Sequence, residues 1–177
     1  MKNTFRSLFL SISLTILAAC GGSRPSPKIF AADKCGLTVQ LPSQPKEESR
    51  TANAAGGALV ITLYTLTEGN SIYVVSCNDF PTDQVAAANK DRVLDNIGQG
   101  AMTNIGATLD NQTSVDLDGH PGRDILGHAT IGGQNAVVRA RVYLVGNRMI
   151  QTLVPGVKGQ MSDANMQTYL TSLKLAK

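Results

Sequence analysis

Cysteine is the residue type in this chain with the clearest chemistry, because a thiol can be acylated, oxidised or bound to a metal. There are three, Cys20, Cys35 and Cys77. Cys35 and Cys77 are far apart and do not form a Cys-x-x-Cys motif, which argues against a redox-active pair. In an exported protein we expect these two to form a structural disulfide. The alternative is two separate buried thiols.

Cys20 ends a segment with the organisation of a secretory signal peptide. Lys2 and Arg6 give a positive start, and the apolar stretch that follows is shorter than the roughly 20 residues of a membrane-spanning helix. Residues 17–20, Leu-Ala-Ala-Cys, resemble the lipobox of bacterial lipoproteins. This resemblance implies removal of residues 1–19 and acylation of Cys20 by palmitate-type chains, which hold a protein stably at a membrane. The alternative is ordinary cleavage after Ala19, leaving Cys20 as a free or disulfide-bonded thiol.

The residue after Cys20 bears on which membrane carries the anchor. It is Gly21, whereas an aspartate there commonly retains Gram-negative lipoproteins in the inner membrane. For a Gram-negative source we therefore expect the periplasmic leaflet of the outer membrane. Removing 19 residues from 177 leaves 158, with 14 basic and 13 acidic residues and a net charge of +1. That balance, without a basic cluster, argues against nucleic acid as a partner.

Catalytic and metal-binding motifs do not stand out. Asp118 and His120 offer two potential metal ligands, but no third ligand has suitable spacing, so we expect no metal and no cofactor. The chain has no Gly-x-Ser-x-Gly motif and no phosphate-binding glycine loop. We therefore expect a protein that is not an enzyme. A hydrolase whose catalytic residues meet only in space remains an alternative.

Polar residues gather on one predicted β-hairpin, which gives the best candidate binding surface. If Gly132-Gly133 is a two-residue turn, then Asp124 faces Arg141, Leu126 faces Arg139 and His128 faces Val137. Side chains alternate between the two faces of a strand, so one face is polar and the other apolar. The candidate binding face consists of Asp124, His128, Arg139, Arg141 and Tyr143. It could bind an anionic ligand or a partner, but we favour a solvated face with one cross-strand ion pair.

The elements that position these residues follow from residue pattern and turn signals. Residues 20–33 contain Gly, Ser and Pro and predict a flexible tether, so the single domain spans residues 34–177. Strands are predicted at 35–41, 58–66, 72–79, 108–117, 123–131, 135–145 and 148–154. One helix is predicted from Thr82 or Asp83 to Gly106, and another follows a cap at Ser162 or Asp163.

This order of elements has no βαβ alternation. It therefore predicts an α+β fold with an antiparallel sheet of about seven strands and two helices packed against it.

Several segments resemble the PsbP-like group, which includes DcrB-like bacterial lipoproteins. They are Leu-Thr-Val-Gln-Leu-Pro at 37–42, Tyr-Val-Val-Ser-Cys-Asn-Asp-Phe-Pro at 73–81, Asp-Gly-His-Pro-Gly-Arg-Asp at 118–124, Arg-Val-Tyr-Leu-Val-Gly-Asn-Arg at 141–148 and Ser-Leu-Lys-Leu at 172–175. The resemblance implies a PsbP-like fold and a non-enzymatic role in binding or assembly support. We therefore expect a lipid-anchored envelope module with a protein partner. The alternatives are a small-molecule or anion-binding lipoprotein and an unrecognised hydrolase.

Overall fold

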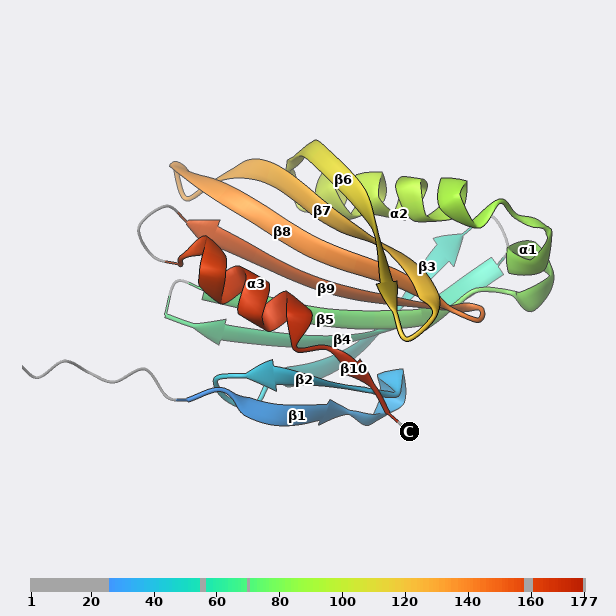
Figure 1. The fold of residues 1–177 in the computed structure, drawn as a ribbon, viewed down its shortest axis with the longest axis horizontal. Coiled ribbons are helices and arrows are strands. Elements are labelled where there is room, and N and C mark those ends of the chain that lie inside the picture. The colour runs from blue at the N-terminus through green and yellow to red at the C-terminus, as the bar shows by residue number, and fades with distance from the viewer. Residues whose placement is uncertain (1–25, 55–56, 70, 158–160, 177) are drawn as a thin grey trace, which may run out of the picture.

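The computed structural model describes residues 26–54, 57–69, 71–157 and 161–176. The strands of these residues form two antiparallel sheets, one of seven strands and one of three (Figure 1). The seven-stranded sheet consists of β3 (Lys46–Ala54), β4 (Gly57–Glu68), β5 (Ser71–Asp79), β9 (Arg148–Val157), β8 (Gln134–Val145), β7 (His120–Ile131) and β6 (Thr108–Leu117), in that order. The antiparallel α+β prediction is confirmed.

Hairpin turns set the registers of the large sheet. Asp118 and Gly119 both have positive φ, as do Gly132 and Gly133, which suits two-residue turns whose twist matches that of the strands. Gly146 also has positive φ, between β8 and β9. The turn predicted at Gly132-Gly133 is therefore confirmed.

The smaller sheet corrects the predicted tether. Strand β1 (Lys28–Ala32) pairs with β2 (Leu37–Leu41), which also pairs with the short β10 (Lys174–Leu175). Phe30 of β1 packs edge-on against Tyr64 of β4, with ring centroids 5.3 Å apart. Residues 28–33 thus belong to the folded domain, which begins before the predicted residue 34. The sequence suggested otherwise because so short a strand is stabilised by packing and not by a long apolar pattern.

Strand β3 was not predicted at all, and the strand expected at 35–41 lies in the smaller sheet. The sequence of β3 is rich in charged and small residues, which have low β-propensity. It forms an edge of the large sheet, where Glu48 pairs with Lys46 and Arg50. Charges on an edge strand discourage pairing with other chains, so the polar pattern suits this position.

The helix predicted from 82 to 106 is two helices, α1 (Thr82–Ala87) and α2 (Lys90–Asn104). Ala88 is extended between them, and the side chain of Asn89 caps α2 by accepting a hydrogen bond from the Arg92 amide at 3.0 Å. The last helix, α3 (Asp163–Thr171), has the predicted cap at Ser162.

Helices α2 and α3 lie against opposite faces of the large sheet (Figure 1). One core lies between the sheet and α2 and includes Leu94, Met102 and Ile125. The other lies beneath α3 and the three-stranded sheet. Helix α2 packs closely because Gly98 has no side chain: a Cβ atom there would lie 3.1 Å from Ile125 Cδ1.

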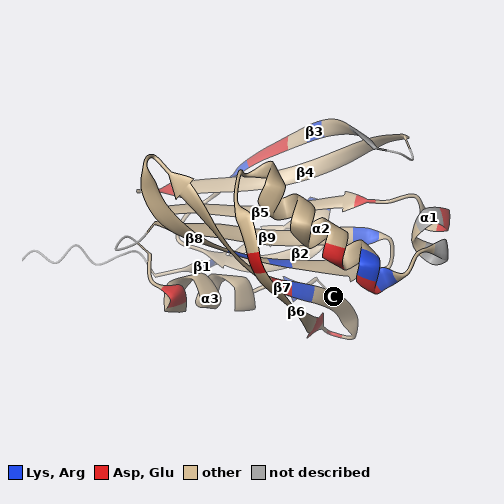
Figure 2. Cartoon of the chain, turned by 90° about the horizontal axis from the view of Figure 1, so that it is seen from above, with Lys and Arg blue, Asp and Glu red and all other residues tan. Residues whose placement is uncertain are grey.

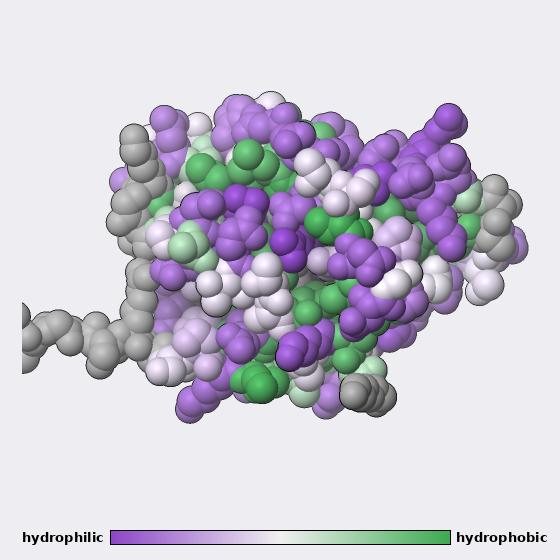
Figure 3. Space-filling model, in the orientation of Figure 1, coloured by the Kyte–Doolittle hydropathy of each residue, from purple (hydrophilic) through white to green (hydrophobic). Residues whose placement is uncertain are grey.

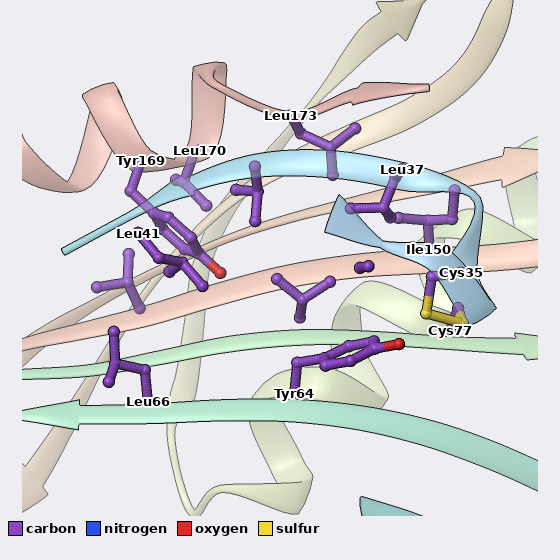
Figure 4. Close-up of a cluster of buried hydrophobic side chains, with 14 of the residues drawn as sticks. Cys35, Leu37, Leu41, Tyr64, Leu66, Cys77, Ile150, Tyr169, Leu170 and Leu173 are labelled. Carbon is purple, nitrogen blue, oxygen red and sulfur yellow. A yellow bond between two sulfur atoms is a disulfide. The ribbon is translucent and has the colours of Figure 1, made fainter. Parts of the chain in front are cut away.

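A disulfide joins Cys35 and Cys77, as predicted, with Cα atoms 5.6 Å apart. Cys35 ends the 3₁₀ turn Asp33–Cys35, and Cys77 lies in β5, so the bond links the N-terminal layer to the large sheet. Both residues are buried in the core that Figure 4 shows, beside Leu37, Tyr64 and Ile150. The bond therefore fixes the position of the smaller sheet.

Candidate functional site

The β7–β8 hairpin has the predicted register. Asp124 faces Arg141, Leu126 faces Arg139 and His128 faces Val137. The opposite face of these strands is buried against α2, as expected from the alternation of side chains. The sequence therefore placed the backbone of the candidate binding face correctly.

The side chains on that face form an ion-pair network, not a solvated surface. Arg141 Nε lies 2.7 Å from Asp124 Oδ2, and Arg139 Nη2 lies 3.3 Å from Asp124 Oδ1. Arg139 also reaches Asp163 in the first turn of α3, at 2.9 Å. The side chains of Asp124, Arg139 and Arg141 are only 14–18% exposed. The expectation of a single exposed ion pair is wrong, because α3 covers this part of the sheet.

The network joins α3 to the sheet. Two aspartates and two arginines take part, so their formal charges cancel. Burial by itself would lower the pKa of Arg141, but Asp124 and Tyr143 hold that pKa above its ordinary value. These contacts give the face a stabilising role, and an incoming anion would have to compete with two carboxylates already in place.

Of the other two predicted members of the face, Tyr143 interacts with Arg141 of the network, whereas His128 pairs with Asp110 on β6. Tyr143 is buried, and its ring packs against Gly122, where a Cβ atom would collide with it. Burial raises the pKa of Tyr143. His128 is exposed, lies 2.6 Å from Asp110 on β6, and lines a hollow of about 590 Å³ with Val137 and Met166. Asp124, Arg139, Arg141 and Tyr143 thus interact with one another, and His128 is the predicted residue that pairs outside this group.

Two partners of the predicted residues were not predicted: Asp163, which pairs with Arg139, and Asp110, which pairs with His128. The pairing of residues across the hairpin does not predict Asp163, because the position of this residue depends on how α3 packs against the sheet. Asp110 sits at a register irregularity between Leu109 and Asn111, which shifts β6 relative to β7. Neither feature has a signature in the local sequence.

The described residues form no metal-binding cluster and no hydrogen-bonded pair of a nucleophile with a histidine base. No three His, Cys, Asp or Glu side chains come together there as a metal site. Within the same residues, neither histidine forms a hydrogen bond with a serine, threonine or cysteine, and His128 has Asp110 as its partner. Asp118 and His120, weighed above as metal ligands, thus gain no third ligand in that part of the chain.

A cavity of about 360 Å³ lies at the end of the molecule where β1 begins and β4 turns into β5 (Figure 1). Pockets for small ligands typically have volumes of about 300–1,000 Å³. Its walls come from the N-terminal segment, the ends of β2 and β4, the start of β5, and α3. The described residues that line it are Ser26, Pro27, Gln40, Pro42, Glu68, Ser71, Tyr73, Asn165, Thr168 and Tyr169. No local pattern predicts this cavity, which we call the anchor-end cavity after the predicted acylation of Cys20.

Two of the four tyrosines of the chain meet in the wall of the anchor-end cavity. The rings of Tyr73 and Tyr169 are perpendicular, with centroids 5.1 Å apart. Tyr169 is buried, and its hydroxyl donates a hydrogen bond to the Val74 carbonyl at 2.7 Å. Burial, with a further contribution from Tyr73, raises the pKa of Tyr169, so this residue stays neutral. The pair gives the cavity a rigid aromatic wall.

Glu68 is the one charged residue among the described residues that line the cavity. Its Oε2 accepts a hydrogen bond from the Ser43 hydroxyl at 2.9 Å. Within the described part of the chain it forms no ion pair. The carboxylate therefore contributes an uncompensated negative charge to the cavity wall.

The predicted signal peptide and the acylated Cys20 lie outside the described residues, as does the first part of the predicted tether. Cys20 is six residues before Ser26, which lines the cavity. A chain spans at most about 3.3–3.6 Å per residue, so the two residues are within about 20 Å of each other. No helix of the described residues is long and apolar enough to cross a membrane.

No protein-family model matches the chain, and no curated protein matches its sequence. Solved structures do match. The solution structure of cyanobacterial PsbP (CyanoP) from Synechocystis shares 16% identity and a TM-score of 0.58, covering 90% of this chain and 98% of that one. LpqN, described as involved in cell envelope biogenesis of Mycobacterium tuberculosis, shares 12% identity and a TM-score of 0.46, covering 89% and 88%. The similarity to CyanoP shows that the chain has the PsbP-like fold.

Proposed function

We propose that this chain is a lipoprotein acylated at Cys20, whose PsbP-like domain acts without catalysis as a binding or assembly-support module in the cell envelope. The observation that carries the proposal is the location of the cavity. It opens at the end of the domain from which the chain leads back to Cys20, so an acyl anchor would hold this end against the membrane surface.

The disulfide supports the exported location in this proposal. Structural disulfides persist in oxidising compartments and are rare in the cytosol. Gly21 favours the periplasmic leaflet of the outer membrane if the source is Gram-negative. The short link also matters, because a domain held within about 20 Å of a bilayer meets ligands and partners of that surface at a high effective concentration.

The charge pattern favours a binding role that does not involve nucleic acid. Figure 2 shows basic and acidic residues interspersed along the elements, with no extended stripe of one sign. Nucleic acid is bound mainly through such basic stripes. A protein partner in the envelope or a small ligand therefore suits the domain better. The cavity specifically favours a small ligand as the second candidate function.

Two measurements test the proposal. Metabolic labelling with an alkyne fatty acid should label the wild-type chain, and Cys20→Ser should lose both the label and membrane retention, since the thioether requires sulfur. Photo-crosslinking from Thr168, at the cavity, should give adducts that depend on Cys20, whereas crosslinking from Asp118, in the turn at the other end, should not. Membrane retention without label, or adducts independent of Cys20, would contradict the anchored module.

A further inference from the structure

The one charged side chain among the described residues that line the anchor-end cavity is a carboxylate. The cavity wall combines this carboxylate, of Glu68, with the ring of Tyr73, which is held in place by Tyr169. The faces of aromatic rings carry negative charge density and attract cations. The other polar side chains of the wall are neutral hydroxyls and amides, which do not offset the carboxylate.

Among the described residues, the wall offers an anionic ligand few of the groups that it needs. Asn165, in the first turn of α3, already donates its backbone N–H to Ser162 Oγ, and the lining includes no lysine, arginine or histidine. Phosphate and carboxylate groups are bound through such side chains or through backbone amides at helix N-termini. A phosphate placed here would lose its hydration and face Glu68, so the cavity disfavours anions.

Most of the other carboxylates among the described residues form ion pairs with basic side chains. Asp79 pairs with Arg148, Glu48 with Lys46 and Arg50, and Asp124 with two arginines. Glu68 differs, because it lies in a cavity wall with only the Ser43 hydroxyl as a partner among the described residues. An unpaired carboxylate beside an aromatic ring in a cavity of this size has the composition of a cation site.

From this composition we infer that the cavity binds an ammonium group, with Glu68 as the counter-ion and Tyr73 as the cation-π partner. This inference rests on the proposed function, since it names the ligand class of the anchored module. The ammonium could belong to a soluble amine or to the headgroup of a phospholipid in the membrane that carries the anchor. An apolar ligand is a poorer match, because it would cover the Glu68 carboxylate without supplying a counter-ion. Figure 3 shows hydrophilic and hydrophobic side chains mixed over one face of the molecule.

The inference is tested with the acylated mature protein, which begins at Cys20, in a non-ionic detergent. Tetramethylammonium and ethanolamine are titrated while the NMR signals of the tyrosines are followed, and maltose and inorganic phosphate serve as the neutral and anionic probes. Both amines should shift the signals of Tyr73 at lower concentration than maltose or phosphate. Tighter binding of maltose or phosphate at these signals would overturn the ammonium assignment.

Variants test the two proposed contacts. Glu68→Gln keeps the shape of the side chain and should weaken amine binding about tenfold or more, since it removes the counter-ion. Tyr73→Leu should weaken it about 2- to 30-fold. Glu48→Gln is the matched control, because its carboxylate lies on β3 and pairs with Lys46 and Arg50, and it should leave binding unchanged. Thermal melting checks that each variant is folded, and Ser43→Ala, which retains the carboxylate, should still bind. A Glu68→Gln protein that melts normally and binds within twofold of the wild type would refute the assignment.

Vesicles distinguish the two sources of the ammonium group. The acylated protein is reconstituted in phosphatidylglycerol alone or with phosphatidylethanolamine. Weaker tetramethylammonium binding in the second vesicle would identify the lipid headgroup as the occupant, and equal binding would identify a soluble amine. If no probe binds, the ligand assignment fails, whereas loss of fatty-acid labelling is what defeats the anchored module. The two failures are therefore distinct.

Discussion

Replacing both Cys35 and Cys77 with alanine measures how strongly one covalent bond supports this fold. The bond closes a loop between residues 42 positions apart. In the chain-entropy model, releasing a loop of this length from the denatured state costs about 4 kcal/mol in the free energy of unfolding. Both cysteines are buried, so the loss of sulfur packing adds to this value. For a domain of this size the melting temperature should fall by roughly 8–16 °C.

Urea and thermal unfolding without reductant provide the assay, with the wild type and the double alanine variant compared. Addition of reductant is the internal control, because it should destabilise the wild type and leave the variant unchanged. A variant within about 1 kcal/mol of the oxidised wild type would refute the entropic argument for this loop. Titration of two free thiols in addition to any at Cys20 in the non-reduced wild type would refute the disulfide itself.

Three further predictions concern packing and charge. Arg139→Ala should lower the free energy of unfolding by about 1–3 kcal/mol, because Asp124 and Asp163 lose a partner whose side chain is largely buried. A loss under about 0.5 kcal/mol would show that these ion pairs stabilise the fold no more than solvent-exposed pairs do. Gly98→Val should lower the free energy of unfolding by about 2 kcal/mol or more, because the added side chain would push α2 away from the sheet. Gly100→Ala is the control: a Cβ atom there meets no other atom within 4 Å, so the variant should be as stable as the wild type or slightly more stable. Arg148 lowers the pKa of Asp79, so the stabilisation from this pair is present above the ordinary aspartate range and lost as pH falls through the lowered value. The difference in melting temperature between the wild type and Arg148→Gln should therefore shrink from about pH 6 to about pH 2, and a constant difference would contradict this.

The β7–β8 hairpin shows which structural features the local sequence predicts and which it does not. Its register followed from two glycines in the turn and from the alternation of side chains, and every predicted pair is present. The environment of those pairs was mispredicted, because α3 docks over them and brings Asp163 to Arg139. Docking of a helix depends on the shape of both surfaces, which residue spacing along one segment does not encode.

The strands near the N-terminus show the opposite balance. Strands β1, in the smaller sheet, and β3, at an edge of the large sheet, have weak local patterns, and each is stabilised by pairing with a neighbouring strand. Proline, serine and charged residues near β1 favoured a tether, since intrinsic propensity was the only available signal there. The break between α1 and α2 at Ala88 could have been predicted, because Asn89 is a residue type that commonly caps helices. The helical spacing of the apolar residues after it favoured a single helix instead.

The sequence by itself determined the features that depend on neighbouring residues or on chemistry carried by single side chains. These are the signal-like N-terminus ending at Cys20, which stays a prediction, and the turns, most strands and the fold class. The pairing of Cys35 with Cys77 also followed, because an exported domain had two remaining thiols. Only the tertiary structure decided which charges neutralise one another and where the cavity lies. Glu68, Tyr73 and Tyr169 are unremarkable in the sequence, and they form one wall because β4, β5 and α3 converge at the anchor end. Such convergence depends on packing between distant segments, and no local pattern specifies it.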